Sequence, residues 1–187
     1  MPIRPHTVQL YQDDVFLIQS VSAFIKSGIE EGATVIVVTT EEHGKDLQRS
    51  LNSSPALLRE TNVRFFDAAT TLSSFMKDEW PSKHLFLREV GYIIQQAAPT
   101  GPVRVFEEMV AVLCAQDNVR AAIRLEELWN QLAIDQTFAL LCAYPNSVFS
   151  DEKDSDSFLQ VCQTHTHVHT SLYVCAHIQS GPSRKYA

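Results

Sequence analysis

Glycine is scarce in this sequence of 187 residues, and its six glycines do not cluster. None of them forms G-x-G-x-x-G or G-x-x-x-x-G-K-[ST], the loops whose backbone amides wrap phosphate groups in nucleotide-binding α/β domains. The first predicted strand is followed instead by Tyr11-Gln12-Asp13-Asp14, whose two carboxylates would repel a phosphate. The sequence therefore argues against an NTPase and against a Rossmann dehydrogenase.

Catalytic signatures of other classes are also missing. The chain contains no G-x-S-x-G, no H-E-x-x-H and no paired C-x-x-C, which argues against an esterase and a zincin. Glu107, Glu108, Cys142 and His165 are chemically competent residue types, but no spacing links them into a nucleophile–base pair. We therefore expect a protein that is not an enzyme and that has no cofactor.

Positive charge is sparse. The chain has 15 Lys and Arg against 22 Asp and Glu, a net charge of −7, and its arginines are scattered singly. Nucleic-acid binding draws affinity from basic side chains that neutralise phosphates, so we expect no direct nucleic-acid partner. No apolar run approaches the roughly 20 residues of a membrane span, and the N-terminal segment has no apolar signal-peptide core.

Cysteine is too rare for a disulfide framework. Four cysteines in a chain of this length are expected to be reduced thiols. With the absence of a span and of a signal segment, this predicts a cytoplasmic location and no membrane partner.

Apolar runs of two kinds alternate along the chain. The β-branched run TVIVVTT at 34–40 is typical of a strand buried on both faces of a parallel sheet. Strands are predicted at 6–11, 34–40, 63–67, 103–106 and 137–144, with a last edge strand at 171–178. Helical spacing is found at 17–29, 41–51, 72–76, 82–98, 107–115, 119–133 and 158–165. This alternation predicts an α/β three-layer sandwich with a mainly parallel sheet of about five strands.

We expect one domain at 1–178 and a frayed tail at 179–187. In such sheets ligands bind outside the carboxyl ends of the strands. Polar side chains at or near these ends could line one apolar pocket: Tyr11, Asp14, Glu107, Glu108, Cys142 and Tyr144. Structural roles remain open, because Asp14 could cap a helix, Tyr144 could pack before a proline, and Glu108 could favour a first helical turn.

A soft-metal or haem site is an alternative. Cys162 and His165 lie at i and i+3 on a predicted helix, and Cys142 or Cys175 could complete a Cys2His set. Against it, cysteine is often simply buried, and the alternating histidines of THTHVH suit a solvated strand.

Three further positions receive structural interpretations. His6 begins the first strand, at the end opposite the strand exits, so we expect a structural hydrogen bond there. Glu126 and Asn130 share one face of a predicted helix; they could hydrogen-bond into a site, but we expect this face to be solvated. The neighbouring stripe of Leu125, Leu128, Trp129 and Leu132 is expected in the core.

Several stretches together resemble one known family. HTVQLYQDDVFLIQSVSAFIKSGIEEGATVIVVTT at 6–40, VRVFEEMVAVL at 103–113, AAIRLEELWNQLA at 121–133, FALLCAYP at 138–145 and FLQVCQTHTHV at 158–168 are similar to segments of the MEDS domain, the methanogen/methylotroph DcmR sensory domain. The chain departs from the family's usual Gly-Glu-Met, because it has Glu107-Glu108-Met109.

The resemblance implies a fold related to RecA/KaiC-type ATPases without the phosphate-binding loop. It also implies an input domain that binds a small-molecule signal and acts on a partner such as a histidine kinase or transcription regulator. The family's name comes from a regulator that responds to a chlorinated one-carbon compound. A ligand-free adaptor module remains open, as does a homodimer.

Overall fold

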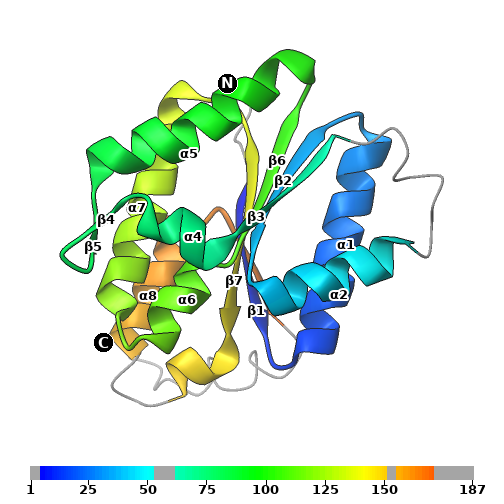
Figure 1. Cartoon of the computed structure of the whole chain (residues 1–187). Helices are drawn as coiled ribbons and strands as arrows, with labels where there is room; N and C mark the ends of the chain where they lie inside the picture. Colours follow the sequence, from blue (N-terminus) through cyan, green and yellow to red (C-terminus); the bar gives the residue numbers. More distant parts are fainter. Residues whose placement is uncertain (1–4, 53–61, 151–154, 171–187) are drawn as a thin grey trace, which may run out of the picture.

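The computed structural model describes residues 5–52, 62–150 and 155–170 (Figure 1). Strands and helices alternate along these ranges. In chain order the elements are β1 His6–Tyr11, α1 Asp14–Glu30, β2 Thr34–Thr39, α2 Glu41–Asn52, β3 Val63–Asp67, α4 Ala68–Ser73, β4 Met76–Lys77, β5 Trp80–Pro81, α5 Lys83–Ala97, η1 Ala98–Thr100, β6 Val103–Glu107, α6 Met109–Ala115, α7 Val119–Asp135, β7 Ala139–Pro145, η2 Asn146–Phe149, α8 Ser155–Thr164 and β8 His167–Thr170.

The central sheet has six strands in the order β3-β2-β6-β7-β1-β8, and every pair in it is parallel. The predicted α/β sandwich with a parallel sheet is therefore confirmed, with one strand more than expected. The sixth strand is β8, formed by the His-rich run. The predicted strand at 171–178 and the tail at 179–187 lie outside the described residues.

Helices cover both faces of the sheet (Figure 1). Helices α1 and α2 bury Leu17, Val21 and Leu47 against one face, and a larger core under α4 to α8 covers the other. The stripe predicted on α7 is in this larger core, since Leu125, Leu128, Trp129 and Leu132 are all buried. None of the described helices is long and apolar enough to cross a bilayer.

Local chemistry sets the ends of several elements differently from the predictions. The short helix expected at 72–76 is α4, Ala68–Ser73, because the side chain of Asp67 caps it by accepting from the amide of Thr70 at 2.7 Å. The small β4–β5 hairpin follows, with Asp78 and Glu79 in the left-handed region. The helix expected at 107–115 begins at Met109, because Glu107 is the last residue of β6.

The end of α1 and the start of β2 follow the predicted turn. Gly32 has a φ of 70°, and its amide donates to the carbonyl of Ile29 at 3.0 Å. Glycine reaches this conformation without strain, so it ends the helix cleanly.

The connections reverse direction between β2 and β6. The chain leaves β2 through α2 on one face toward β3, and it leaves β6 through α6 on the other face toward β7. The two loops diverge, so the carboxyl ends of these strands form the kind of crevice in which open α/β sheets bind ligands.

Candidate functional site

The six residues predicted to share a pocket fall into two groups on opposite faces of the sheet. Glu107 ends β6 and lies beside Glu126 of α7, whereas Glu108, the N-cap of α6, contacts His43 of α2 on the other face. Tyr11 packs with the α1–α2 core, and Cys142 and Tyr144 pack with the core under α4 to α8. The structure thus brings Tyr11, Asp14 and Glu108 to one place, and Glu107, Cys142 and Tyr144 to another.

The first group lies at the crevice between β2 and β6. The Glu108 carboxylate is buried and accepts hydrogen bonds from the Thr39 hydroxyl and, at 3.1 Å, from the Thr40 amide. Its other oxygen faces Nδ1 of His43 at 2.5 Å. Nε2 of His43 lies 3.4 Å from the exposed carboxylate of Asp14. We call Asp14, Thr39, His43 and Glu108 the crevice cluster.

Both ring nitrogens of His43 face carboxylates, and this favours the imidazolium. The hydrogen bond to Glu108 raises the pKa of His43 to about 8, against the opposing effect of burial. The pKa of Tyr11, at the end of β1, is raised by burial and by the charges of Glu108 and Asp14. The crevice therefore holds a largely protonated histidine between two carboxylates, beside a neutral phenol.

The capping role considered for Asp14 belongs to its neighbour. The side chain of Asp13 accepts from the Phe16 amide at 2.8 Å and is the N-cap of α1, whereas Asp14 is the first helical residue. This leaves the Asp14 carboxylate available to His43.

A hollow of about 300 Å³ adjoins the crevice cluster at the carboxyl ends of β2 and β3. Its lining mixes aromatic, hydroxyl and charged side chains: Thr39, Thr40, Glu41, Gly44, Lys45, Gln48, Phe65, Phe66 and Asp67. None of the six predicted site residues lines this hollow, but it shares Thr39 with the crevice cluster. A larger cavity of about 550 Å³ between α4, the β4–β5 hairpin and α6 contains neither the predicted residues nor a member of the crevice cluster.

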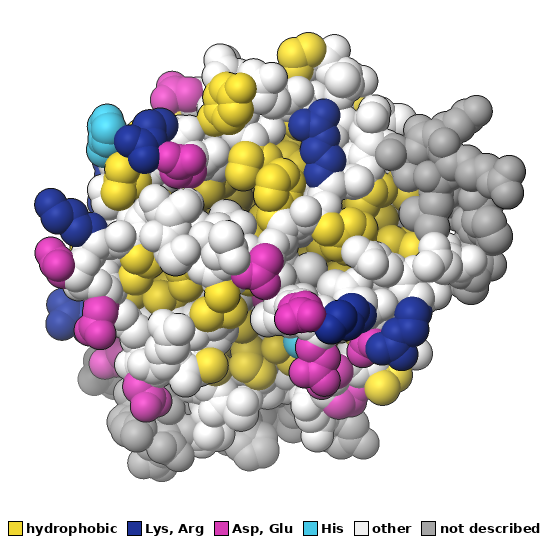
Figure 2. Space-filling view, viewed as in Figure 1, with side chains coloured by type: hydrophobic (Ala, Val, Ile, Leu, Met, Phe, Trp, Pro, Cys, Tyr) yellow, Lys and Arg dark blue, Asp and Glu magenta, His cyan; other side chains and the backbone are white. Residues whose placement is uncertain are grey.

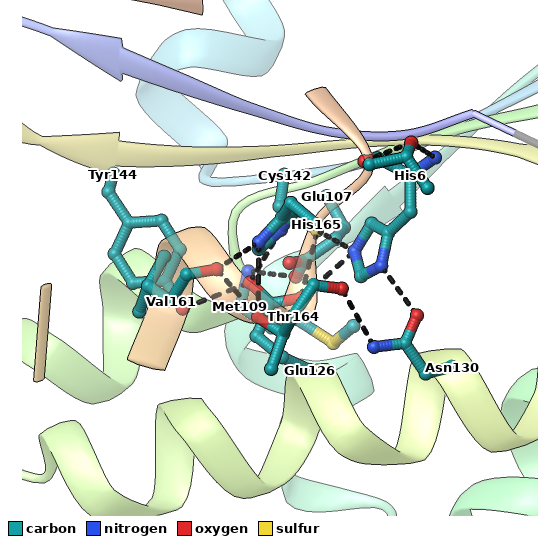
Figure 3. Close-up of polar contacts among 11 residues, drawn as sticks. His6, Glu107, Met109, Glu126, Asn130, Cys142, Tyr144, Val161, Thr164 and His165 are labelled. Carbon is teal, nitrogen blue, oxygen red and sulfur yellow. Dashed lines mark hydrogen bonds and ion pairs between the residues drawn. The ribbon is translucent and has the colours of Figure 1, made fainter. Parts of the chain in front are cut away.

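The second group is a fully enclosed polar centre (Figure 3). Nε2 of His6 lies 3.1 Å from Oε2 of Glu126 and 3.4 Å from Sγ of Cys142, and the Cys142 thiol donates to Glu126 at 3.4 Å. Nε2 of His165 lies 3.3 Å from Oε1 of Glu126. We call His6, Glu126, Cys142 and His165 the buried cluster.

Neighbouring groups orient the two imidazoles. Nδ1 of His6 lies 2.9 Å from Oδ1 of Asn130, whose Nδ2 donates to the carbonyl of Thr164 at 2.9 Å. Nδ1 of His165 lies 2.6 Å from the carbonyl of Val161. Because both partners are acceptors, each Nδ1 carries a proton, and Nε2 of each ring points into the centre toward Glu126. Burial works to lower the pKa of His165, but the charge of Glu126 raises it above its ordinary value.

The carboxylates of this centre are strongly perturbed. Burial works to raise the pKa of Glu126, but His165 and His6 hold it below its ordinary value. Burial and the charge of Glu126 raise the pKa of Glu107, whose Oε1 is buried with no hydrogen-bond partner. The Tyr144 hydroxyl donates to Glu126 at 3.0 Å. Glu126 is thus the charged member and Glu107 the neutral one.

Two structural interpretations of the sequence were wrong or incomplete here. Glu126 is completely buried rather than solvated, because it lies one turn from Ala122 and Trp129 on the inner face of α7. His6 does make the expected hydrogen bond, to Asn130, but it also joins the buried cluster. Of the alternative metal pair, His165 lies in the centre, while Cys162 is only half-buried and does not belong to it.

The comparisons agree with this architecture. The profile of the MEDS family, the methanogen/methylotroph, DcmR sensory domain, matches residues 5–166. That range is most of the chain, so the protein belongs to this sensory family, as the resemblance indicated. No curated protein matches the chain significantly.

Proposed function

We propose that this sensory domain binds a small organic molecule or metabolite at the crevice between β2 and β6 and passes the signal to a partner protein. One observation carries the proposal. The buried carboxylate of Glu108 lies where the connections reverse direction, held by Thr39, Thr40 and His43 beside a hollow of about 300 Å³. Thr39 and Thr40 both hydrogen-bond to Glu108 and line the hollow, so a polar ligand there would meet groups that are already tied to a buried charge.

Ligand binding there reaches elements that can carry a signal. His43 belongs to α2 and Asp14 to α1, so a ligand that competes for Glu108 alters the link between these helices and the sheet. A signalling protein such as a histidine kinase or a transcription regulator is the proposed recipient. The same proposal includes a cytoplasmic location and a homodimer.

In this proposal the domain binds its ligand and does not convert it chemically. In the buried cluster, Cys142, His6 and Asn130 are in line like a nucleophile, a base and its orienting group. The cluster is enclosed, however, and burial with the charge of Glu126 raises the pKa of the Cys142 thiol well above its ordinary value. An unactivated thiol without access for a substrate favours a structural or binding role.

The test begins with native mass spectrometry of the purified full chain, which reports any retained small molecule and the oligomeric state. A thermal-shift screen of small organic acids, amines and alcohols follows. We expect Glu108→Gln and Tyr11→Phe to weaken binding of a confirmed ligand, Glu108→Gln by about 10–100-fold, because hydrogen bonds to charged groups contribute about 1.5–3 kcal/mol.

The matched control is Glu127→Gln. Glu127 is a half-exposed carboxylate on α7 that pairs with Arg124 of the same helix. Both residues lie on the face of the sheet opposite the crevice cluster. Substitution of Glu127 leaves ligand affinity unchanged. If Glu108→Gln and Tyr11→Phe fold normally and bind the confirmed ligand as the unaltered protein does, the crevice is not the binding site.

A further inference from the structure

The four side chains of the buried cluster come from four separate elements and meet at one point (Figure 3). His6 is the first residue of β1, Cys142 lies in β7, Glu126 lies in α7, and His165 directly follows α8. One potential ligand atom from each lies within 4.8 Å of all the others. These are the residue types that bind borderline-soft divalent ions.

The separations match those around a tetrahedral ion. Zinc bonds of roughly 2.0–2.3 Å to nitrogen, oxygen and sulfur place neighbouring ligand atoms about 3.3–3.6 Å apart. His6 Nε2, Glu126 Oε2 and Cys142 Sγ are 3.1 to 3.4 Å from one another. Little movement is needed to fit an ion among them.

The cluster gathers five possible ligand atoms around one point. Nε2 of His6, Nε2 of His165, both carboxylate oxygens of Glu126 and Sγ of Cys142 face one another there. His165 Nε2 is completely buried and faces the Glu126 oxygen at 3.3 Å. A cation held among these atoms would replace the protons that they share and satisfy all of them together.

We infer that the buried cluster is a binding site for one zinc-type divalent metal ion, with His6 Nε2, Glu126, Cys142 Sγ and His165 Nε2 as its ligands. On binding, the thiol proton of Cys142 and any proton on either Nε2 are released to solvent, and the sulfur bonds to the metal as thiolate. Carboxylate and thiolate then balance the two positive charges of the ion. This site is separate from the crevice of the proposed function.

The surroundings have the features of a metal site's second layer. Ligating histidines commonly donate their other ring nitrogen to an oxygen acceptor, as His6 does to Asn130 and His165 to Val161. Four protein ligands in an enclosed centre leave no open position, which is typical of structural rather than catalytic zinc. The ion would fasten the end of α8 to β1, β7 and α7.

The test uses the full chain. Metal content is measured on freshly purified protein; the protein is then stripped with a chelator and titrated with Co²⁺, and Zn²⁺ is added in competition. We expect one equivalent of Co²⁺ with visible absorption of a tetrahedral ion and near-ultraviolet thiolate-to-metal absorption, both lost when Zn²⁺ displaces it.

Variants assign the ligands. Cys142→Ser abolishes the thiolate absorption, whereas Cys162→Ser, the matched control on α8, retains it. Asn130→Ala keeps the spectrum but lowers metal affinity about 10–100-fold, because Asn130 orients His6 without touching the ion. Glu108→Gln leaves metal binding unchanged, because Glu108 lies in the crevice. The metal site and the crevice site can therefore be disproved independently of each other.

Zinc X-ray absorption of the unaltered protein gives a readout that does not depend on variants folding. We expect one sulfur neighbour at about 2.3 Å and the remaining neighbours at about 2.0 Å. A folded protein that binds no metal, a bound ion without a sulfur neighbour, or equal loss of binding in Cys142→Ser and Cys162→Ser overturns the inference.

Discussion

At the scale of single residues, the crevice cluster depends on one histidine. His43 connects the buried carboxylate of Glu108 with the exposed carboxylate of Asp14, so it joins the first turns of α1 and α2 to the end of β6. His43 can donate a proton to both carboxylates only when both of its ring nitrogens are protonated. Its charge therefore couples the crevice to pH.

Protonated His43 stabilises the folded protein. Its pKa is raised from 6.5 to about 8, so its contribution is fully present below pH 6.5 and is lost as the pH rises through 8. We expect the excess unfolding free energy of the unaltered protein over His43→Gln to fall by about 1 kcal/mol across this window, allowing for partial solvent screening. Chemical denaturation at several pH values measures it.

The partner carboxylate provides the control. With Glu108→Gln in both proteins, the difference between histidine and glutamine at position 43 should lose most of its pH dependence, since Glu108 is the main cause of the shift. When Glu108 is unaltered, the unfolding free energies of the histidine and glutamine proteins should differ less at pH 8 than at pH 6.5. A constant difference would contradict a charged His43 in the folded state.

The sequence indicated which polar residues lie near the ends of the strands. It did not indicate that they divide into two groups on opposite faces of the sheet. Glu107 is the last residue of β6 and Glu108 is the N-cap of α6, so the two carboxylates separate where the strand ends, and the sequence did not indicate that point exactly. Glu126 could have been placed by its spacing from Trp129. The meeting of His6 with His165 could not, because strand order rather than local pattern brings residues 159 positions apart together.

At the scale of elements, the start of α1 separates two adjacent aspartates by role. We expect Asp13→Ala to lower the unfolding free energy by about 1 kcal/mol, because it removes the oxygen that caps the Phe16 amide. Asp14→Ala removes a favourable first-turn charge and one partner of His43, and should cost only a few tenths of a kcal/mol at an exposed site. Urea denaturation of the three proteins compares them.

Conservative variants distinguish capping from charge. Asp13→Asn and Asp13→Ser keep a capping oxygen and should retain most of the stability. If Asp14→Ala is the more destabilising of the two alanine variants, the assignment of the cap is wrong.

Long apolar patterns predicted elements well, and short ones did not. The strand in the run at 34–40 is buried on both faces and the stripe of α7 on one face of its helix, so the apolar pattern and the burial agree in each. The β4–β5 hairpin has only two residues in each strand and depends on Asp78 and Glu79 adopting positive φ, which no local pattern indicates. Strand β8 is polar except for Val168, and it forms because β1 provides an edge with which it can pair.

At the scale of the whole molecule, the buried cluster links the last described elements to the first. The amide of Thr166 donates to the carbonyl of His6 at 2.7 Å, and the amide of His6 donates to the Thr166 hydroxyl at 2.9 Å. His165 lies beside this junction. Whatever occupies the cluster therefore acts on how firmly α8 and β8 are held.

We expect Zn²⁺ to slow amide hydrogen exchange in α8 and β8 of the metal-stripped protein by at least about tenfold, equivalent to 1.4 kcal/mol against local opening. Helix α1, on the other face of the sheet, should change much less. Exchange followed by mass spectrometry resolves these segments. Slowing that is equal in α1 and α8, or absent from α8, contradicts local fastening, and Cys142→Ser should show no response.

The order of strands also matters during synthesis on the ribosome. Strand β1 is translated early, yet both of its neighbours in the sheet, β7 and β8, begin 133 or more residues later, at Ala139 and His167. At roughly 5–20 residues per second, this wait lasts on the order of 7–27 seconds. Through that interval an apolar strand has no partner, while β2, β3 and β6 are free to pair. Newly made chains are thus exposed to aggregation until the far end of the domain emerges.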